Sequence, residues 1–201
     1  HTMTSSHHLT KQQILDSVSS GNIKTIQLYF EQQNGTSSSA DDLLPDQLLC
    51  EACSFGRAQI ARYLIEHQNA NPQAKNDFGN SPLVFASNSG NVETIRYLVE
   101  HCNVPMDQGE VTPLMTCAAQ GHLDAVKYFI QKGIDPHAKD DEAFSALLYA
   151  AQGGHLNVVR FLIEEVKMST SDKTEEGQSA VDLAEESGVE EVVEYLKERG
   201  I

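Results

Sequence analysis

A glycine recurs along this chain at a nearly constant spacing, and this repetition constrains the fold more than any other feature. It ends a short segment of small apolar residues and precedes a second apolar segment, at Gly21, Gly56, Gly90, Gly121, Gly154 and Gly188. By subtraction, successive glycines are 35, 34, 31, 33 and 34 residues apart. A period of about 33 residues predicts a stack of two-helix units, because one such unit cannot bury its apolar face without its neighbours.

The best-preserved unit shows why each half of the repeat is expected to be helical. It begins at Thr112 and reads TPLMTCAAQGHLDAVKYFI. Thr112 can cap free backbone amides, and Pro113 takes the first helical position, where it loses no hydrogen bond. Gly121 then ends the first helix. The second helix presents apolar residues at helical spacing, which we expect to form a shared core: Val126, Phe129 and Ile130.

This pattern resembles the ankyrin repeat, which reads G-x-T-P-L-H-x-A-A-x-x-G-H-x-x-V-V-x-x-L-L-x-x-G-A. Similar segments are SPLVFASNSGN from Ser81 and AAQGGHLNVVRFLI from Ala150. The resemblance extends from about Ile14 to the C-terminus. It implies an all-α solenoid of about six helix–turn–helix units with short finger loops and degenerate terminal caps. We expect a tag remnant and unstructured start at 1–10 and one domain at 11–201, with repeats near 11–41, 42–74, 75–106, 107–138, 139–172 and 173–201.

The chain departs from the ankyrin pattern in two ways. The histidine of T-P-L-H is absent from every unit, and its position holds Cys50, Val84, Met115, Leu148 or Asp182. We therefore expect the hydrogen bonds of that histidine to be replaced or lost. The step from Gly90 to Gly121 is short by two residues, which predicts a trimmed or distorted finger around residues 105–108. His122 and His155 match the G-H of the pattern, and we expect them to be structural.

The charge of the chain indicates a class of partner. The net charge is −15, with 6 basic and 10 acidic residues in 1–100 and 8 basic and 19 acidic residues in 101–201. Such a field repels nucleic acid and attracts basic surfaces, so a basic protein is the expected partner. The alternative is that the charge serves solubility alone. No apolar run reaches the ~18 residues of a membrane span and no signal peptide is visible, so neither a membrane contact nor secretion is expected.

Nothing in the sequence predicts catalysis. Cys50 and Cys53 form a C-x-x-C, but no second pair completes a zinc site, and Cys53 and Cys117 occupy small-residue positions of the repeat. The histidines fall at different steps of the array and do not converge. We expect no enzyme activity, no metal and no cofactor. Reduced thiols favour the cytoplasm or nucleus, and we expect a monomer when the protein is free.

The resemblance implies where a partner binds, because ankyrin repeats use the finger tips and the exposed side of the first helices. Three aromatic residues stand at such positions, although each could instead pack inward on the next unit: Phe55, Phe78 and Phe144. Carried over to this chain, the full set of candidate partner-binding residues is Leu44, Asp46, Phe55, Asp77, Phe78, Asn80, Asn88, Gln120, Asp141, Glu142, Phe144, Gln152, Glu175, Glu176 and Gln178.

These observations lead to one functional hypothesis and several alternatives. The hypothesis is a non-catalytic interaction module, an adaptor or chaperone that binds a basic partner on an acidic concave face. One alternative is an inhibitory or regulatory subunit, or a secreted bacterial effector, that masks an enzyme or a transcription factor. Another is a structural scaffold without a ligand of its own. The serine-rich segment Ser37–Ser39 is a possible phosphorylation site, although such turns more often have no function.

Overall fold

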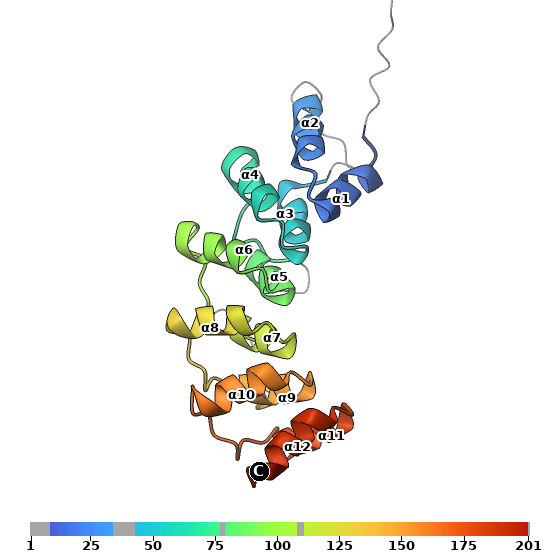
Figure 1. Cartoon of the computed structure of the whole chain (residues 1–201). Helices are drawn as coiled ribbons and strands as arrows, with labels where there is room; N and C mark the ends of the chain where they lie inside the picture. Colours follow the sequence, from blue (N-terminus) through green and yellow to red (C-terminus); the bar gives the residue numbers. More distant parts are fainter. Residues whose placement is uncertain (1–8, 34–42, 77–78, 108–110, 201) are drawn as a thin grey trace, which may run out of the picture.

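The computed structural model describes residues 9–33, 43–76, 79–107 and 111–200, and this part of the chain is helical, as predicted. The helices follow one another in pairs along the sequence (Figure 1). We call the pairs units 1 to 6. Their bounds are α1 (Lys11–Ser20), α2 (Ile23–Gln33), α3 (Pro45–Ser54), α4 (Ala58–Gln68), α5 (Pro82–Ser89), α6 (Val92–Arg96) with a π-helical turn (Tyr97–His101), α7 (Pro113–Ala119), α8 (Leu123–Gln131), α9 (Ala146–Gln152), α10 (Leu156–Glu164), α11 (Ala180–Glu186) and α12 (Glu190–Glu198).

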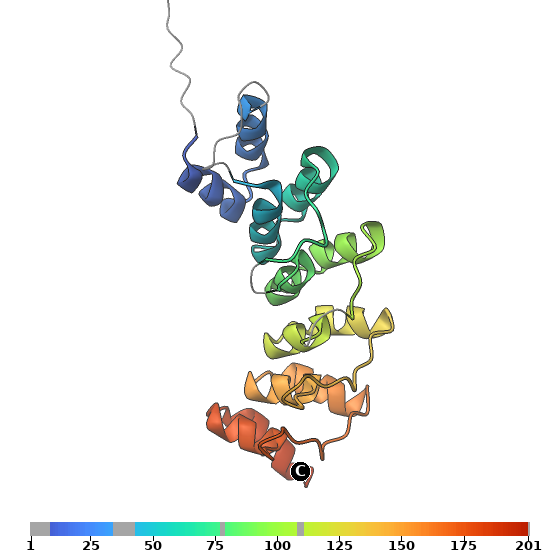
Figure 2. The ribbon, with the colours of Figure 1, turned by 180° about the vertical axis from the view of Figure 1, so that it is seen from behind.

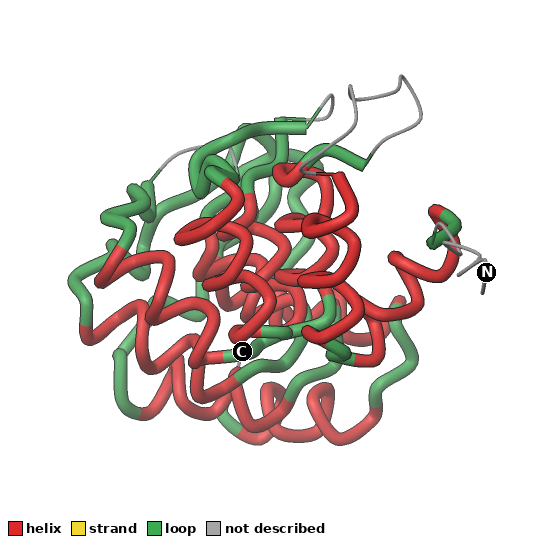
Figure 3. Tube along the Cα trace, turned by 90° about the horizontal axis from the view of Figure 1, so that it is seen from above, coloured by secondary structure: helices red, strands yellow, loops and turns green. Residues whose placement is uncertain are grey.

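The units stack into a curved array with unit 1 at one end and unit 6 at the other. Outer helices α4, α6, α8 and α10 follow the convex edge, and inner helices α3, α5, α7 and α9 follow the concave edge (Figure 1). The view from behind shows the same order (Figure 2). Seen along the stack, the helices overlie one another and the loops gather at the edges (Figure 3). Finger loops join each outer helix to the next inner helix, which places them beside the concave face.

The core runs continuously through the stack because the same repeat position is buried in unit after unit. The residue eight places after the repeated glycine is 0% exposed in five units: Leu64, Leu98, Phe129, Leu162 and Leu196. Each such side chain contributes about 1.5–3 kcal/mol through its burial. The small residues expected between the helices, including Cys53 and Cys117, are also fully buried. The predicted shared core is therefore confirmed.

Polar side chains at the start of the outer helices connect each unit to the one before. The His122 Nε2 lies 2.9 Å from the carbonyl oxygen of Asn88, and the His155 Nε2 lies 2.9 Å from that of Ala119. Both carbonyls belong to the last turn of the preceding inner helix, where they lack a partner within the helix. The predicted structural role of the two histidines is confirmed. Arg57 donates in the same way to the carbonyl of Ser19.

The missing histidine of T-P-L-H is replaced in some units and lost in others. In unit 4 the thioether of Met115 accepts from the amide of Thr112 at 3.4 Å. In unit 6 a carboxylate oxygen of Asp182 accepts from both the amide and the hydroxyl of Ser179, each at 2.7 Å. In unit 5 nothing replaces it, since the buried hydroxyl of Ser145 has no hydrogen-bond partner within the described residues.

The short step between Gly90 and Gly121 coincides with an irregular outer helix. After Arg96 the helix widens into the π-helical turn, in which the amide of Cys102 donates to the carbonyl of Tyr97 at 3.2 Å. The chain then reaches Pro113 through a short finger whose tip, with Gln108, lies outside the described residues. Within the described ranges, no helix has both the length and the apolar character needed to cross a bilayer.

A pair of serine variants tests the caps. Ser179→Ala should lower the free energy of unfolding by about 1 kcal/mol, because it removes a helix cap. Ser145→Ala should leave it unchanged or raise it by up to about 1 kcal/mol, because a buried hydroxyl without a partner disappears. Urea unfolding followed by circular dichroism would measure both. An equal loss in the two variants would contradict this account of unit 5.

A pair of glycine variants tests the contact between units. Gly121 has φ +76° and a Cβ there would lie 2.4 Å from the His155 Nδ1, whereas Gly133 has φ +89° and a Cβ would meet nothing within 4 Å. Alanine at either site costs about 1–2 kcal/mol for the left-handed backbone. Gly121→Ala should cost at least about 1 kcal/mol more, because it also displaces the ring that bonds to Ala119. Equal denaturation midpoints for the two variants would argue against this contact.

Candidate functional site

The finger loops beside the concave face are held by short backbone links. The amide of Asp140 donates to the carbonyl of Phe144 at 3.1 Å, and that of Thr174 donates to Gln178 at 3.0 Å. The finger before α5 closes similarly, from Asn76 to Asn80 at 3.0 Å. Because the fingers before α9 and α11 are closed in this way, their side chains project from hydrogen-bonded turns.

Asp140 organises the finger before α9. One of its carboxylate oxygens accepts from the amides of Glu142 (3.0 Å) and Phe144 (2.8 Å), and the other accepts from the hydroxyl of Tyr149. Phe144 is only 9% exposed and its ring centroid lies 4.9 Å from that of Tyr149. This phenylalanine therefore packs inward, the alternative that the sequence left open, and exposes little surface to a partner.

The fingers before α9 and α11 are joined, and their acidic side chains point to solvent. The amide of Glu175 donates to the carbonyl of Glu142 at 3.0 Å. Glu142, Glu175 and Glu176 are exposed. They surround a depression of about 300 Å³ that we call the C-terminal depression, whose other lining residues are Phe144, Thr174 and Gln178. Asp141 is exposed in the same finger.

These finger carboxylates are not neutralised within the described part of the chain. The side-chain ion pairs found there involve other acids: Arg62–Glu93, Lys132–Glu100, Lys139–Asp172, Lys197–Glu185 and Arg199–Glu164. Lys139, the basic residue nearest in sequence to Asp141 and Glu142, is occupied by Asp172 at 3.0 Å. A positively charged side chain from another molecule would therefore find acceptors that no internal cation occupies.

A second depression, of about 390 Å³, lies between units 2 and 3 on the same side of the stack, and we call it the N-terminal depression. Its lining includes Leu44, Asp46, Cys50, Glu51, Lys75 and Phe85. Leu44 is 59% exposed although it is a large apolar residue. Asp46 also has a structural contact, because one of its carboxylate oxygens accepts a hydrogen bond from the amide of Asn71 at 2.7 Å.

The remaining predicted residues are spread along the inner helices and fingers. Phe55 follows α3 and is 48% exposed. Asn88, Gln120 and Gln152 are exposed near the ends of successive inner helices. The side chain of Gln178 donates to Glu186, and Asn80 is half-buried. Asp77 and Phe78 lie outside the described residues. The structure thus brings together the acidic residues of units 5 and 6, and Leu44 with Asp46, but it does not gather the described candidates into one cluster.

Sequence reasoning missed an ordered row of side chains on the convex face. Hydroxyls of tyrosines on outer helices donate to glutamates of the preceding unit, in the pairs Tyr97–Glu66, Tyr128–Glu100 and Tyr195–Glu164. A cation of the preceding unit lies over each ring, in the pairs Arg62–Tyr97, Arg96–Tyr128 and Arg160–Tyr195.

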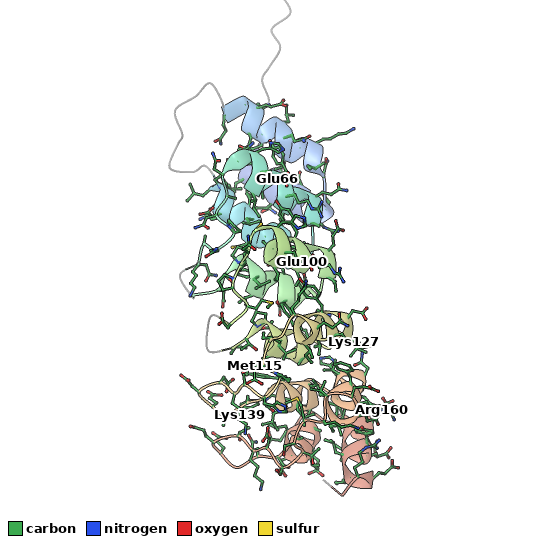
Figure 4. All side chains as sticks on the ribbon, turned by 90° about the vertical axis from the view of Figure 1, so that its left-hand side faces the viewer. Glu66, Glu100, Met115, Lys127, Lys139 and Arg160 are labelled. Atoms are coloured by element: carbon green, nitrogen blue, oxygen red, sulfur yellow. The ribbon has the colours of Figure 1, made fainter. Side chains whose placement is uncertain are left out.

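At unit 5 the row contains Phe161 beneath Lys127. We call this row the convex ladder. In Figure 4, Glu66, Glu100, Lys127 and Arg160 follow one another obliquely from unit 2 to unit 5. A signal existed in the sequence: a basic residue directly precedes an aromatic one at Arg62, Arg96, Lys127 and Arg160.

The described residues give no support to metal or thiol chemistry. No group of three or more histidine, cysteine, aspartate or glutamate side chains in these ranges could hold a metal ion. Burial raises the pKa of the Cys50 thiol to about 11 and that of Cys117 to about 12. Both thiols therefore stay protonated at neutral pH, in the form that is a poor nucleophile.

Comparisons with known proteins agree with the helix pairs. The family model described as "Ankyrin repeats (3 copies)" matches residues 49–140 and 114–201. Alpha-latrocrustotoxin-Lt1a of Latrodectus tredecimguttatus is 24% identical over 93% of this chain and 14% of its own length. The liver isoform of mitochondrial glutaminase from Rattus norvegicus is 34% identical over 44% of this chain and 15% of its own length. Ankyrin repeat domain-containing protein 39 of Homo sapiens is 41% identical over 25% of this chain and 28% of its own length.

The chain thus spans between about a seventh and about a quarter of the length of these relatives. The likeness to glutaminase is a partial match of repeats, and proteins made of such repeats alone are typically non-catalytic.

One rung of the convex ladder predicts how stability depends on pH. The hydrogen bond from Lys132 lowers the pKa of the Glu100 carboxyl below its ordinary value of 4.5. Because the folded-state pKa is depressed, the stabilisation is complete above pH 4.5 and is lost as the pH falls through the lowered value. The wild type should therefore unfold at higher urea than Glu100→Gln at neutral pH, and this difference should vanish in acid and shrink in high salt. A difference that persists unchanged at low pH would contradict the prediction.

Proposed function

The chain belongs to the ankyrin-repeat family, and on that premise we propose that it is a non-catalytic adaptor or chaperone that binds a basic protein segment on its acidic concave face. The family supports protein binding in general. The choice of a basic partner rests on three exposed glutamates of the two joined fingers, Glu142, Glu175 and Glu176, which form no ion pair with the described residues.

The charge of the remaining surface supports the same choice. Residues 101–201 hold 19 of the 29 acidic residues of the chain, so the half of the chain that contains the joined fingers is the more acidic one. A field of one sign raises the association rate of an oppositely charged partner and suppresses partners of like charge. Single exposed ion pairs contribute at most about 1 kcal/mol each, so several must act together with apolar contacts to give a stable complex.

Charge reversal at the fingers tests this proposal. The variant Glu142→Lys/Glu175→Lys/Glu176→Lys should recover at least about tenfold less basic protein than the wild type in affinity capture from native extract at low ionic strength, because three acceptors become repulsive. Capture by the wild type should also fall as salt rises, since screening shortens the reach of the field. Quantitative identification of the co-purifying chains gives the measurement.

A matched control keeps the test specific to the face. The variant Glu31→Lys/Glu165→Lys/Glu198→Lys changes the net charge by the same amount at exposed positions on α2 and at the ends of α10 and α12. It should capture basic protein far better than the finger variant does. Equal capture by the two variants would show that net charge alone matters, and undiminished capture by the finger variant would overturn the proposal.

A further inference from the structure

The two depressions lie on one side of the stack, a fixed number of units apart. The N-terminal depression lies between units 2 and 3, and the C-terminal depression between units 5 and 6. The two are therefore separated by three steps of the array. Neighbouring packed helices lie about 8–10 Å apart, which places the depressions about 24–30 Å from each other. An extended polypeptide covers this distance with about eight residues, at about 3.3–3.6 Å each.

The two depressions differ in chemistry. Around the C-terminal depression, carboxylates of three residues project from backbone that is hydrogen-bonded from finger to finger. At the N-terminal depression, Leu44 leaves 59% of its surface exposed beside the half-buried Phe85 and Cys50. Leu44 is the most exposed large apolar side chain within the described residues. An apolar side chain that covered it would remove this surface from water, which is favourable in proportion to the area buried.

The acidic rim of the N-terminal depression restricts the occupant further. Asp46 and Glu51 border it, against one cation, Lys75. An acidic segment would meet like charge at both depressions, and so would a second copy of this chain, whose net charge is −15. Charge complementarity therefore favours a basic segment at both depressions.

We propose that the concave face binds one extended segment of a partner protein in a fixed register, with a large apolar side chain at the N-terminal depression and a Lys or Arg pair about eight residues away at the C-terminal depression. This inference rests on the proposed function and adds to it the spacing and the chemistry of the partner. The spacing follows from the pitch of the repeats, so it excludes basic segments that lack an apolar residue at that distance.

Selection from a display library of random peptides of about 16 residues, twice the expected spacing, tests the register. The full chain is the bait, at low ionic strength. The enriched peptides should share a large apolar residue and, about eight positions away, two basic residues. Their binding is then measured by fluorescence anisotropy against defined variants of the chain.

Leu44→Ser is the informative variant, because Leu44 occupies the N-cap of α3, where serine is favoured and folding is safeguarded. It should weaken binding by about tenfold, which is the effect of leaving one leucine contact unmade. Replacing the apolar residue of the peptide by alanine should weaken binding to the wild type but not further to Leu44→Ser. The matched control Leu28→Ser, at a leucine 46% exposed on α2, should bind like the wild type.

The outcomes separate this inference from the proposed function. One outcome is enriched peptides that are basic, lack an apolar residue and bind Leu44→Ser as tightly as the wild type. That result overturns the proposed spacing of an apolar and a basic contact, but not the proposal of a basic partner. Peptides that are not basic, or that bind the finger variant Glu142→Lys/Glu175→Lys/Glu176→Lys as well as the wild type, overturn both. About three residues of extended chain span about 10 Å. Loss of binding when the spacing in the peptide is shortened or lengthened by that amount supports the inference. The absence of any peptide with Kd below about 100 μM, a binding free energy of about −5.5 kcal/mol, overturns it.

Discussion

The contact between one helix pair and the next is what the rest of this structure depends on. Phe129 and Leu162 are fully buried in the stack, and a unit alone cannot bury its apolar face in this way. Hydrogen bonds from His122 and His155 to carbonyls of the preceding helix add direction to this apolar contact. Glycine is needed at position 121 for the same reason, because a Cβ there would collide with the ring of His155. Burial therefore provides the stability, and the polar contacts fix how far each unit is rotated against its neighbour.

Most of the fold could be predicted from the sequence because it repeats. The glycine recurs six times, and the T-P-L or S-P-L helix starts and the small residues between helices recur in several units, so each local signal is supported by its copies. What could not be predicted depends on contacts between copies. The loss of a cap partner at Leu148 was expected in general, but the burial of the Ser145 hydroxyl follows only from packing. The π-helical turn after Arg96 likewise reflects how a short unit is fitted between two regular ones.

The candidate site was predicted less completely, and for a similar reason. Position in the repeat identifies the finger residues, but not the direction of their side chains. Phe144 stands at a partner-facing position and yet packs on Tyr149, while Phe85 and Lys75, which were not predicted, line a depression. The link from Glu175 to Glu142 joins two fingers that are 33 residues apart. Such a link cannot be inferred from either finger alone, although it fixes where the acidic side chains stand.

The convex ladder has one incomplete rung, and this has a mechanical consequence. Phe161 has no hydroxyl, so at the junction of units 4 and 5 the ring stays under Lys127 but donates nothing to a carboxylate. Separating the outer helices α8 and α10 therefore breaks one hydrogen bond fewer than separating the outer helices that Tyr97, Tyr128 or Tyr195 connects. The outer edge of this joint is therefore held by the cation–π contact and apolar packing, without a tyrosine hydrogen bond. This joint lies between the N-terminal and the C-terminal depression, so its angle sets the distance between the exposed leucine and the finger glutamates.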